Sequence, residues 1–127
     1  MVLPGGNPAQ RRSFMMAGRE RRRREESMHL GILVNSDDRL RIIIGLTRAA
    51  LAGGHQVTIF AMDEGTRLLE AEDFVALAGE SAVSMSYCDH SARQLRINTA
   101  MLPGEIECSS QFSNAAMVHN ADKVLVL

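Results

Sequence analysis

The sequence has little of what several large functional classes require. Of its 127 residues only 4% are aromatic, none is Trp and two are Cys. Two cysteines are too few for a disulfide framework or for a zinc site built from paired ligands, and scarce aromatic rings leave few surfaces for stacking bases. Apolar runs stay far below the roughly 20 residues that a membrane-spanning helix needs. We therefore expect one cytoplasmic domain with a core of aliphatic and methionine side chains.

Charge is divided unevenly along the chain. Residues 1–27 contain seven Arg and three Glu, a net charge of +4, whereas residues 28–127 contain seven Lys or Arg and twelve Asp or Glu, a net charge of −5. The first segment has Pro, Gly and a block of four arginines but no sustained apolar period, which is typical of a disordered basic arm. The folded domain is therefore expected at 28–127. So short an arm cannot read a base sequence, and a nucleic-acid partner is not expected.

From residue 28 onward, apolar runs typical of buried strands alternate with helical patterns. The expected strands are 29–34, 56–61, 82–87, 106–108 and 123–127, and the expected helices are 40–51, 67–78 in one piece or two, 92–97 and 112–120. The acidic cluster at 35–38 is placed to cap the first helix, and Ser109 or Ser110 to cap the last. This alternation predicts an α/β fold, a three-layer sandwich with a mostly parallel central sheet. Apolar residues left on the helix at 67–78 are expected to be covered by neighbouring subunits.

Three polar segments directly follow expected strands. Because open α/β sheets bind ligands at the carboxyl ends of their strands, these segments are expected to surround a site. They are 35–38 (Asn-Ser-Asp-Asp), 62–65 (Met-Asp-Glu-Gly) and 88–91 (Cys-Asp-His-Ser). The candidate substrate-binding residues among them are Asn35, Ser36, Asp37, Asp63, Glu64 and Ser91.

Cys88 is the candidate for covalent chemistry, because it stands where a strand is expected to give way to a helix. Backbone N–H groups just after it, at residues 89–91, can stabilise a thiolate and make it available at neutral pH. His90 could add positive charge or move a proton, whereas Asp89 would oppose the thiolate. The alternative is that Cys88 is a small buried residue at a strand end, where free Cys is common.

The sequence gives weaker evidence for a second reactive thiol, a metal site or a cofactor site. Cys108 could be a second thiol near Cys88, although a packing role suits its apolar setting better. Adjacent Cys, Asp and His residues without a paired motif do not predict a metal site, so no metal is expected. The segment after the first strand lacks the glycine-rich patterns that hold phosphates, and no cofactor is expected.

Several of these segments, taken together, resemble the DsrE/DsrF-like family of sulfur-relay proteins. The resemblance is carried by 35–38, 53–57, 62–65 and 83–91, and it continues through 95–97 and 121–125. It covers roughly the whole expected domain.

The resemblance implies a DsrEFH-like three-layer domain that forms homotrimers or homohexamers. In such relay proteins a cysteine after the third long strand, here matching Cys88, takes up sulfur as a persulfide from a rhodanese-like or TusA-like donor and passes it onward. The expected function is thus cytoplasmic persulfide transfer through Cys88, a sulfurtransferase activity, with Asp89 and His90 shaping the thiol pKa. The alternative is a non-catalytic interaction subunit or small-ligand module of the same fold.

Overall fold

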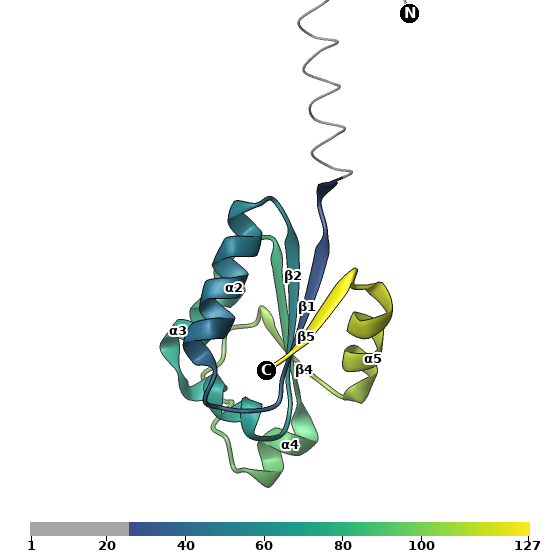
Figure 1. The fold of residues 1–127 in the computed structure, drawn as a ribbon. Helices are drawn as coiled ribbons and strands as arrows, with labels where there is room; N and C mark the ends of the chain where they lie inside the picture. Colours follow the sequence, from purple (N-terminus) through teal and green to yellow (C-terminus); the bar gives the residue numbers. More distant parts are fainter. Residues whose placement is uncertain (1–25) are drawn as a thin grey trace, which may run out of the picture.

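The computed structural model describes residues 26–127, and the arm expected at 1–27 lies almost wholly outside the described residues. A five-stranded sheet forms the centre, in the order β4-β3-β2-β1-β5, and every neighbouring pair of strands is parallel (Figure 1). The strands are β1 (His29–Val34), β2 (Gln56–Ala61), β3 (Val83–Cys88), β4 (Ile106–Ser109) and β5 (Lys123–Val126). The helical elements are α2 (Leu40–Ala52), η1 (Asp63–Glu70), α3 (Glu72–Val75), η2 (Ala76–Gly79), α4 (Asp89–Gln94) and α5 (Gln111–Asn120). The predicted α/β class with a parallel sheet is confirmed.

Strand order explains the three layers. From β1 to β4 the chain adds strands in one direction, and its connections place α2 and α3 on one face of the sheet (Figure 1). It then returns through α5 to β5, on the other side of β1. Because crossovers between parallel strands are right-handed, this reversal of direction carries α5 to the opposite face. The first face is therefore covered by several elements, whereas α5 is the helix seen on the second.

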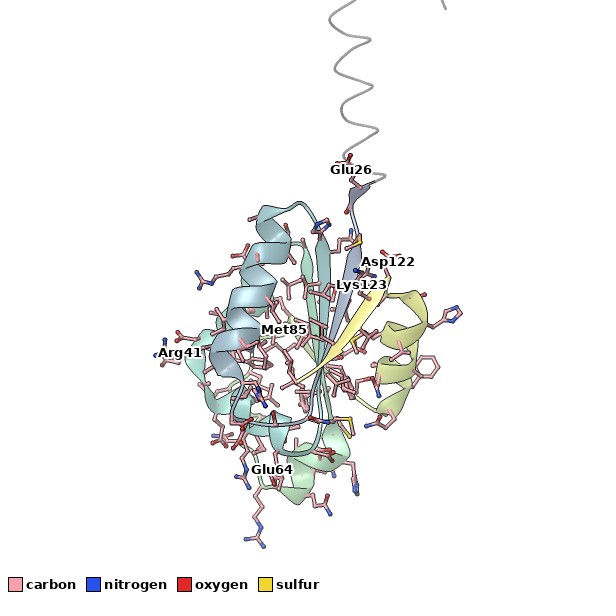
Figure 2. All side chains as sticks on the ribbon, viewed as in Figure 1. Glu26, Arg41, Glu64, Met85, Asp122 and Lys123 are labelled. Carbon is pink, nitrogen blue, oxygen red and sulfur yellow. The ribbon has the colours of Figure 1, made fainter. Side chains whose placement is uncertain are left out.

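The larger core lies between the sheet and α2. Ile32, Ile59 and Met85 occupy neighbouring strands of this face and are buried against Ile43 and Phe74. Figure 2 shows Met85 among the packed side chains beside α2, whereas Arg41 points outward from the same helix. Burying an aliphatic side chain contributes about 1.5–3 kcal/mol, so this face supplies most of the stability of the domain.

A smaller cluster lies beneath α5. Phe60, Cys88 and Met117 are buried together, with Leu33 and Met62 packed partly against them. Strand alternation sends Phe60 and Cys88 to this side of the sheet, while their neighbours Ala61 and Tyr87 belong to the larger core. The candidate thiol therefore belongs to the sparsely covered side.

Of the two alternatives for 67–78, the structure has the two-piece one: η1 ends at Glu70, and after the extended Ala71 the chain forms α3, which runs directly into η2 and ends at Gly79. The structure corrects three other local expectations. Within 67–78 the large apolar side chains of Leu68, Leu69, Phe74 and Leu77 are already buried within the monomer, and Val75 is partly buried. The acidic cluster at 35–38 does not cap α2, whose N-cap is Arg39 without a side-chain hydrogen bond. The helix expected at 92–97 begins directly after β3, at Asp89.

One further expectation agrees with the structure. Ser110 is the N-cap of α5, and its hydroxyl oxygen accepts a hydrogen bond from the backbone N–H of Phe112 at 3.2 Å. Gly54 ends the turn after α2 with φ 81°, a conformation that glycine adopts without steric cost. Within the described part of the chain, no helix combines the length and apolar character needed to cross a membrane.

Candidate functional site

Cys88 is the last residue of β3, and α4 begins at the next residue. Its backbone is extended, with φ −78° and ψ 115°, so the chain changes from strand to helix directly at the thiol. The side chain is 5% exposed and packs with Phe60 and Met117. The thiol is therefore held on its inner side by apolar side chains.

A pocket of about 620 Å³ lies over the outer side of this residue. Its lining comes from three chain segments that meet at the carboxyl end of the sheet: the residues after β2, the start of α4, and the junction of β4 and α5. The lining residues are Met62, Asp63, Cys88, Asp89, His90, Ser91, Ser109, Ser110, Gln111 and Phe112. A buried thiol that lines an open pocket can be reached by another sulfur atom while it stays shielded from bulk water.

Hydrogen-bond donors around Cys88 favour its ionised form. Burial by itself raises the pKa of the Cys88 thiol, because a charged sulfur is poorly solvated there. Against this, hydrogen bonds from the hydroxyl and backbone N–H of Ser91, the side-chain amide of Gln111 and the backbone N–H of His90 stabilise the thiolate. Together these donors lower the pKa of Cys88 below its ordinary value. The thiolate is the nucleophilic form of cysteine, so the site favours reactivity.

The charged side chains expected beside the thiol behave differently from one another. Asp89 lines the pocket, but its carboxylate forms an ion pair with Arg93, one helical turn further along α4. The distance from Asp89 Oδ2 to Arg93 Nε is 2.8 Å. His90 lines the pocket and is exposed, and its backbone N–H helps to lower the pKa of Cys88. Asp63 also lines the pocket, with φ 49°, in the left-handed region that Asp tolerates better than most residues.

Four of the candidate substrate-binding residues lie elsewhere. Asn35 and Ser36 donate their backbone N–H groups to the carbonyl oxygen of Leu127, at 2.9 and 3.3 Å, so their loop holds the end of the chain beside β1. Asp37 is exposed and does not line the pocket. Glu64 forms an ion pair with Arg67 at 2.5 Å and lies at the molecular edge (Figure 2). Of this set, only Asp63 and Ser91 line the pocket of Cys88.

Cys108 is separated from that pocket by the sheet. The register pairs Tyr87 with Cys108 and Cys88 with Ser109, so Cys108 and Cys88 are one position out of step and point to opposite faces. Cys108 is exposed, and its side chain lies on the same face of the sheet as that of its register partner Tyr87. It is neither a second thiol beside Cys88 nor a packed core residue.

The sequence interpretation missed the wall formed by residues 109–112. This wall lies beside Cys88 because β4 pairs in parallel with β3 and ends next to it. Within 109–112, Gln111 supplies a donor to the thiolate, and Phe112, 80% exposed, forms an apolar rim. The expected strand at 106–108 was the available signal, since a strand placed next to β3 must bring the following residues to the same edge.

No arrangement of three or more His, Cys, Asp or Glu side chains suited to a metal ion occurs within residues 26–127. The donor set around Cys88 consists of hydroxyl, amide and backbone N–H groups, which suit an anionic sulfur. These residues are placed to bind an anion rather than a cation.

Comparison with known proteins shows the fold. No protein-family model matches the chain, and no curated protein matches it. Among solved structures, the ychN protein from E. coli superposes with a TM-score of 0.60 at 16% identity, over 80% of this chain and 99% of that one. MTH1491 from Methanobacterium thermoautotrophicum, described as a protein of unknown function, superposes with a TM-score of 0.63 at 16% identity, over 80% of this chain and 100% of that one. The chain is similar to both over nearly their whole length, and its fold is DsrE-like.

Proposed function

We propose that this protein is a cytoplasmic sulfur carrier that accepts and releases sulfane sulfur through Cys88, a sulfurtransferase reaction. The Cys88 thiolate attacks the outer sulfur of a donor persulfide, a new S–S bond forms at Cys88, and the donor's S–S bond breaks. The donor cysteine leaves as a thiolate, so sulfur moves without any net oxidation or reduction. In the return step an acceptor thiolate attacks the outer sulfur of the Cys88 persulfide, and the Cys88 thiolate is restored.

One observation carries the proposal: the sulfur of Cys88 is shielded on one side, open to a pocket on the other, and faced by donors that lower its pKa. A carrier needs this combination, because the thiolate must react with a persulfide while the bound persulfide must be protected from other thiols and from water. Ser91, itself 5% exposed, provides the most direct donors, through its hydroxyl and its backbone N–H. A cysteine serving only as a small core residue requires no such donors.

We propose proteins of the TusA-like or rhodanese-like kind as sulfur donors and acceptors. Such partners present their sulfur on a protein surface, and the exposed Phe112 at the pocket rim offers an apolar contact for one. We also propose a homotrimer or homohexamer, in which further copies of the chain cover exposed apolar side chains of α5 and β5. These are Val118, Leu125 and Val126. Light scattering coupled to gel filtration tests this assembly, and a monomer at micromolar concentration contradicts it.

The direct test of carriage is mass spectrometry of the intact protein after incubation with a sulfane-sulfur donor. We expect the wild type to gain about 32 Da, the mass of one sulfur atom, and to lose it again when a thiol acceptor is added. Cys108→Ala should retain the adduct, since this thiol lies on the opposite face. Absence of the adduct from the wild type, or its persistence in Cys88→Ala, contradicts carriage through Cys88.

The second candidate function is a non-catalytic interaction subunit, favoured by the low exposure of Cys88 together with the exposed rim at Phe112. Under this hypothesis Cys88 fills the small core, and Phe112 contributes to a binding surface. The two functions predict different thiol chemistry. Alkylation of Cys88 near pH 6.5 that is no faster than that of an ordinary thiol, whose pKa is about 8.5, favours the interaction subunit. Faster alkylation favours the carrier.

A further inference from the structure

Gln111 is the first residue of α5, and its side chain faces the sulfur-lined part of the pocket. Its amide nitrogen Nε2 donates a hydrogen bond to the thioether sulfur Sδ of Met62 at 3.7 Å. Both residues line the same pocket as Cys88, and Met62 packs partly against the cluster that contains this thiol. The amide thus points its nitrogen at Met62 Sδ, on the wall of the pocket that also contains Cys88.

Asn114, one helical turn later, controls which end of this amide faces the sulfurs. Its Nδ2 donates a hydrogen bond to Oε1 of Gln111 at 3.1 Å. A half-turn of the Gln111 amide would set two NH₂ groups against each other and lose this bond. A half-turn of Asn114 would set two oxygens against each other instead. Asn114 therefore keeps the oxygen of Gln111 on the helix side and its N–H groups on the sulfur side.

The other end of Asn114 supports this assignment. Its Oδ1 is buried and has no hydrogen-bond partner among the described residues. The side-chain amide of Asn114 therefore makes one hydrogen bond, which its nitrogen donates to Gln111. Burying an unpaired oxygen is unfavourable, and free rotation would normally relieve it. The contact to Gln111 is therefore the interaction that accounts for the orientation of Asn114.

We propose that Gln111 binds the reactive sulfur of Cys88 through its amide N–H, and that Asn114 is the positioning residue that keeps this N–H turned toward the sulfur. Unlike the backbone N–H groups of Ser91 and His90, a side-chain amide can turn or be displaced when a partner enters the pocket. Gln111 is therefore an adjustable donor of the site, whereas the backbone N–H groups of Ser91 and His90 are fixed donors. The inference rests on the proposed sulfur chemistry at Cys88, but it concerns ionisation of the thiol and can be tested without any sulfur donor.

The test is the pH profile of Cys88 alkylation by iodoacetamide, in a Cys108→Ala background where Cys88 is the remaining thiol. Gln111→Leu keeps the size of the wall but has no donor, and we expect alkylation at pH 6.5 to slow about three- to tenfold as the profile moves to higher pH. Gln111→Glu places a carboxylate near the sulfur and should slow it further. Unchanged profiles in both variants overturn the assignment of Gln111.

Asn114→Asp tests the positioning role, because it replaces the donor to Gln111 by an acceptor of nearly the same shape. The Gln111 amide should then turn, present its oxygen to the sulfur and slow alkylation as much as Gln111→Leu does. In the Gln111→Leu background, Asn114→Asp should add no further slowing, since there is no amide left to turn. Equal slowing in both backgrounds would mean that the new charge acts directly, and it overturns the positioning role. Asn120→Asp, at the other end of α5, is the matched charge control and should leave the profile unchanged.

The sulfur-loading experiment tests carriage through Cys88, and the alkylation profiles test the roles of Gln111 and Asn114, so either hypothesis can be contradicted without the other. A wild type that takes up no sulfur, yet whose alkylation depends on Gln111 and Asn114 as described, contradicts carriage and leaves the inference intact. A wild type that carries sulfur and whose profile is insensitive to both residues contradicts the inference alone. Thermal unfolding followed by circular dichroism verifies that each variant is folded before its profile is compared.

Discussion

Gly65 is the position at which a single methyl group should most damage the domain. A Cβ atom built on Gly65 would lie 2.1 Å from the carbonyl oxygen of Val34 and 2.6 Å from its carbonyl carbon. These are backbone atoms at the end of β1, and that oxygen also accepts a hydrogen bond from the N–H of Met62 at 2.9 Å. Unlike the end of a flexible side chain, the backbone can yield only if β1 and the turn at 62–65 separate.

The expected magnitude follows from these contacts. Overpacking a rigid site costs about 1–3 kcal/mol, and backbone contact places Gly65→Ala at the upper end of that range. Losing the hydrogen bond between Met62 and Val34 adds about 1 kcal/mol. We therefore expect Gly65→Ala to lower the free energy of unfolding by about 3–4 kcal/mol, a large fraction of the stability of a small domain. The corresponding fall in melting temperature exceeds about 10 °C.

Gly45→Ala is the matched control for this experiment. Gly45 lies within α2, and a Cβ there would have no neighbour within 4 Å. Because Ala forms helices better than Gly, this variant should be more stable than the wild type by about 0.5–1 kcal/mol. Urea unfolding of both variants measures the difference. If Gly65→Ala proves as stable as Gly45→Ala, the close contact between the turn and β1 does not exist in solution and the reasoning is refuted.

Three further predictions concern the site and its surroundings. Ser110→Ala removes the cap that accepts the N–H of Phe112 and should cost about 1 kcal/mol in urea unfolding; no loss contradicts the cap. Because its pKa is lowered, Cys88 should react with iodoacetamide at lower pH in the folded protein than in the urea-unfolded chain, as peptide mass spectrometry can measure; the reverse order contradicts the donor arrangement. Burial, reinforced by the hydrogen bond with the Cys108 side chain, raises the pKa of Tyr87, so the folded state keeps its phenol proton to higher pH than the unfolded chain. Stability should therefore fall as the pH rises above about 10, and Tyr87→Phe should reduce that fall in unfolding experiments repeated across this range.

The strands were the most predictable part of the fold. β1 and β2 have the predicted bounds, because a strand buried in the middle of a parallel sheet must be an apolar run and few other structures require one. The region from Asp63 to Gly79 was less predictable. Its apolar residues Leu68, Leu69 and Leu77 are spaced as in a helix, but the chain breaks at Ala71, which has φ −97° and ψ 120°. The break is set by packing against the core, which local spacing does not encode.

The sequence could predict only those site residues that lie close to Cys88 along the chain. The segment 88–91 carries both the thiol and the donors of Ser91 and His90, so reading along the chain is enough to find them. Asn35 and Ser36 follow a strand just as closely, yet they bind the end of the chain at Leu127, because β5 pairs with β1 and occupies the adjacent edge. Which loop faces a pocket and which holds another strand depends on strand order, and no single segment contains that information.

Strand order also explains why the pocket forms at Cys88 rather than at the end of another strand. After β4, at one edge of the sheet, the chain crosses through α5 to β5 at the other edge. β4 pairs with β3 and ends beside it. The start of α5 must therefore lie next to Cys88, the last residue of β3. After β1 the chain leads into α2 on the opposite, well-covered face, whereas the first residues after β2, Met62 and Asp63, still line the pocket of Cys88. Because Gln111 and Phe112 belong to α5 and most of the core lies on the α2 side, substitutions of these two residues should change the reactivity of Cys88 with little effect on stability.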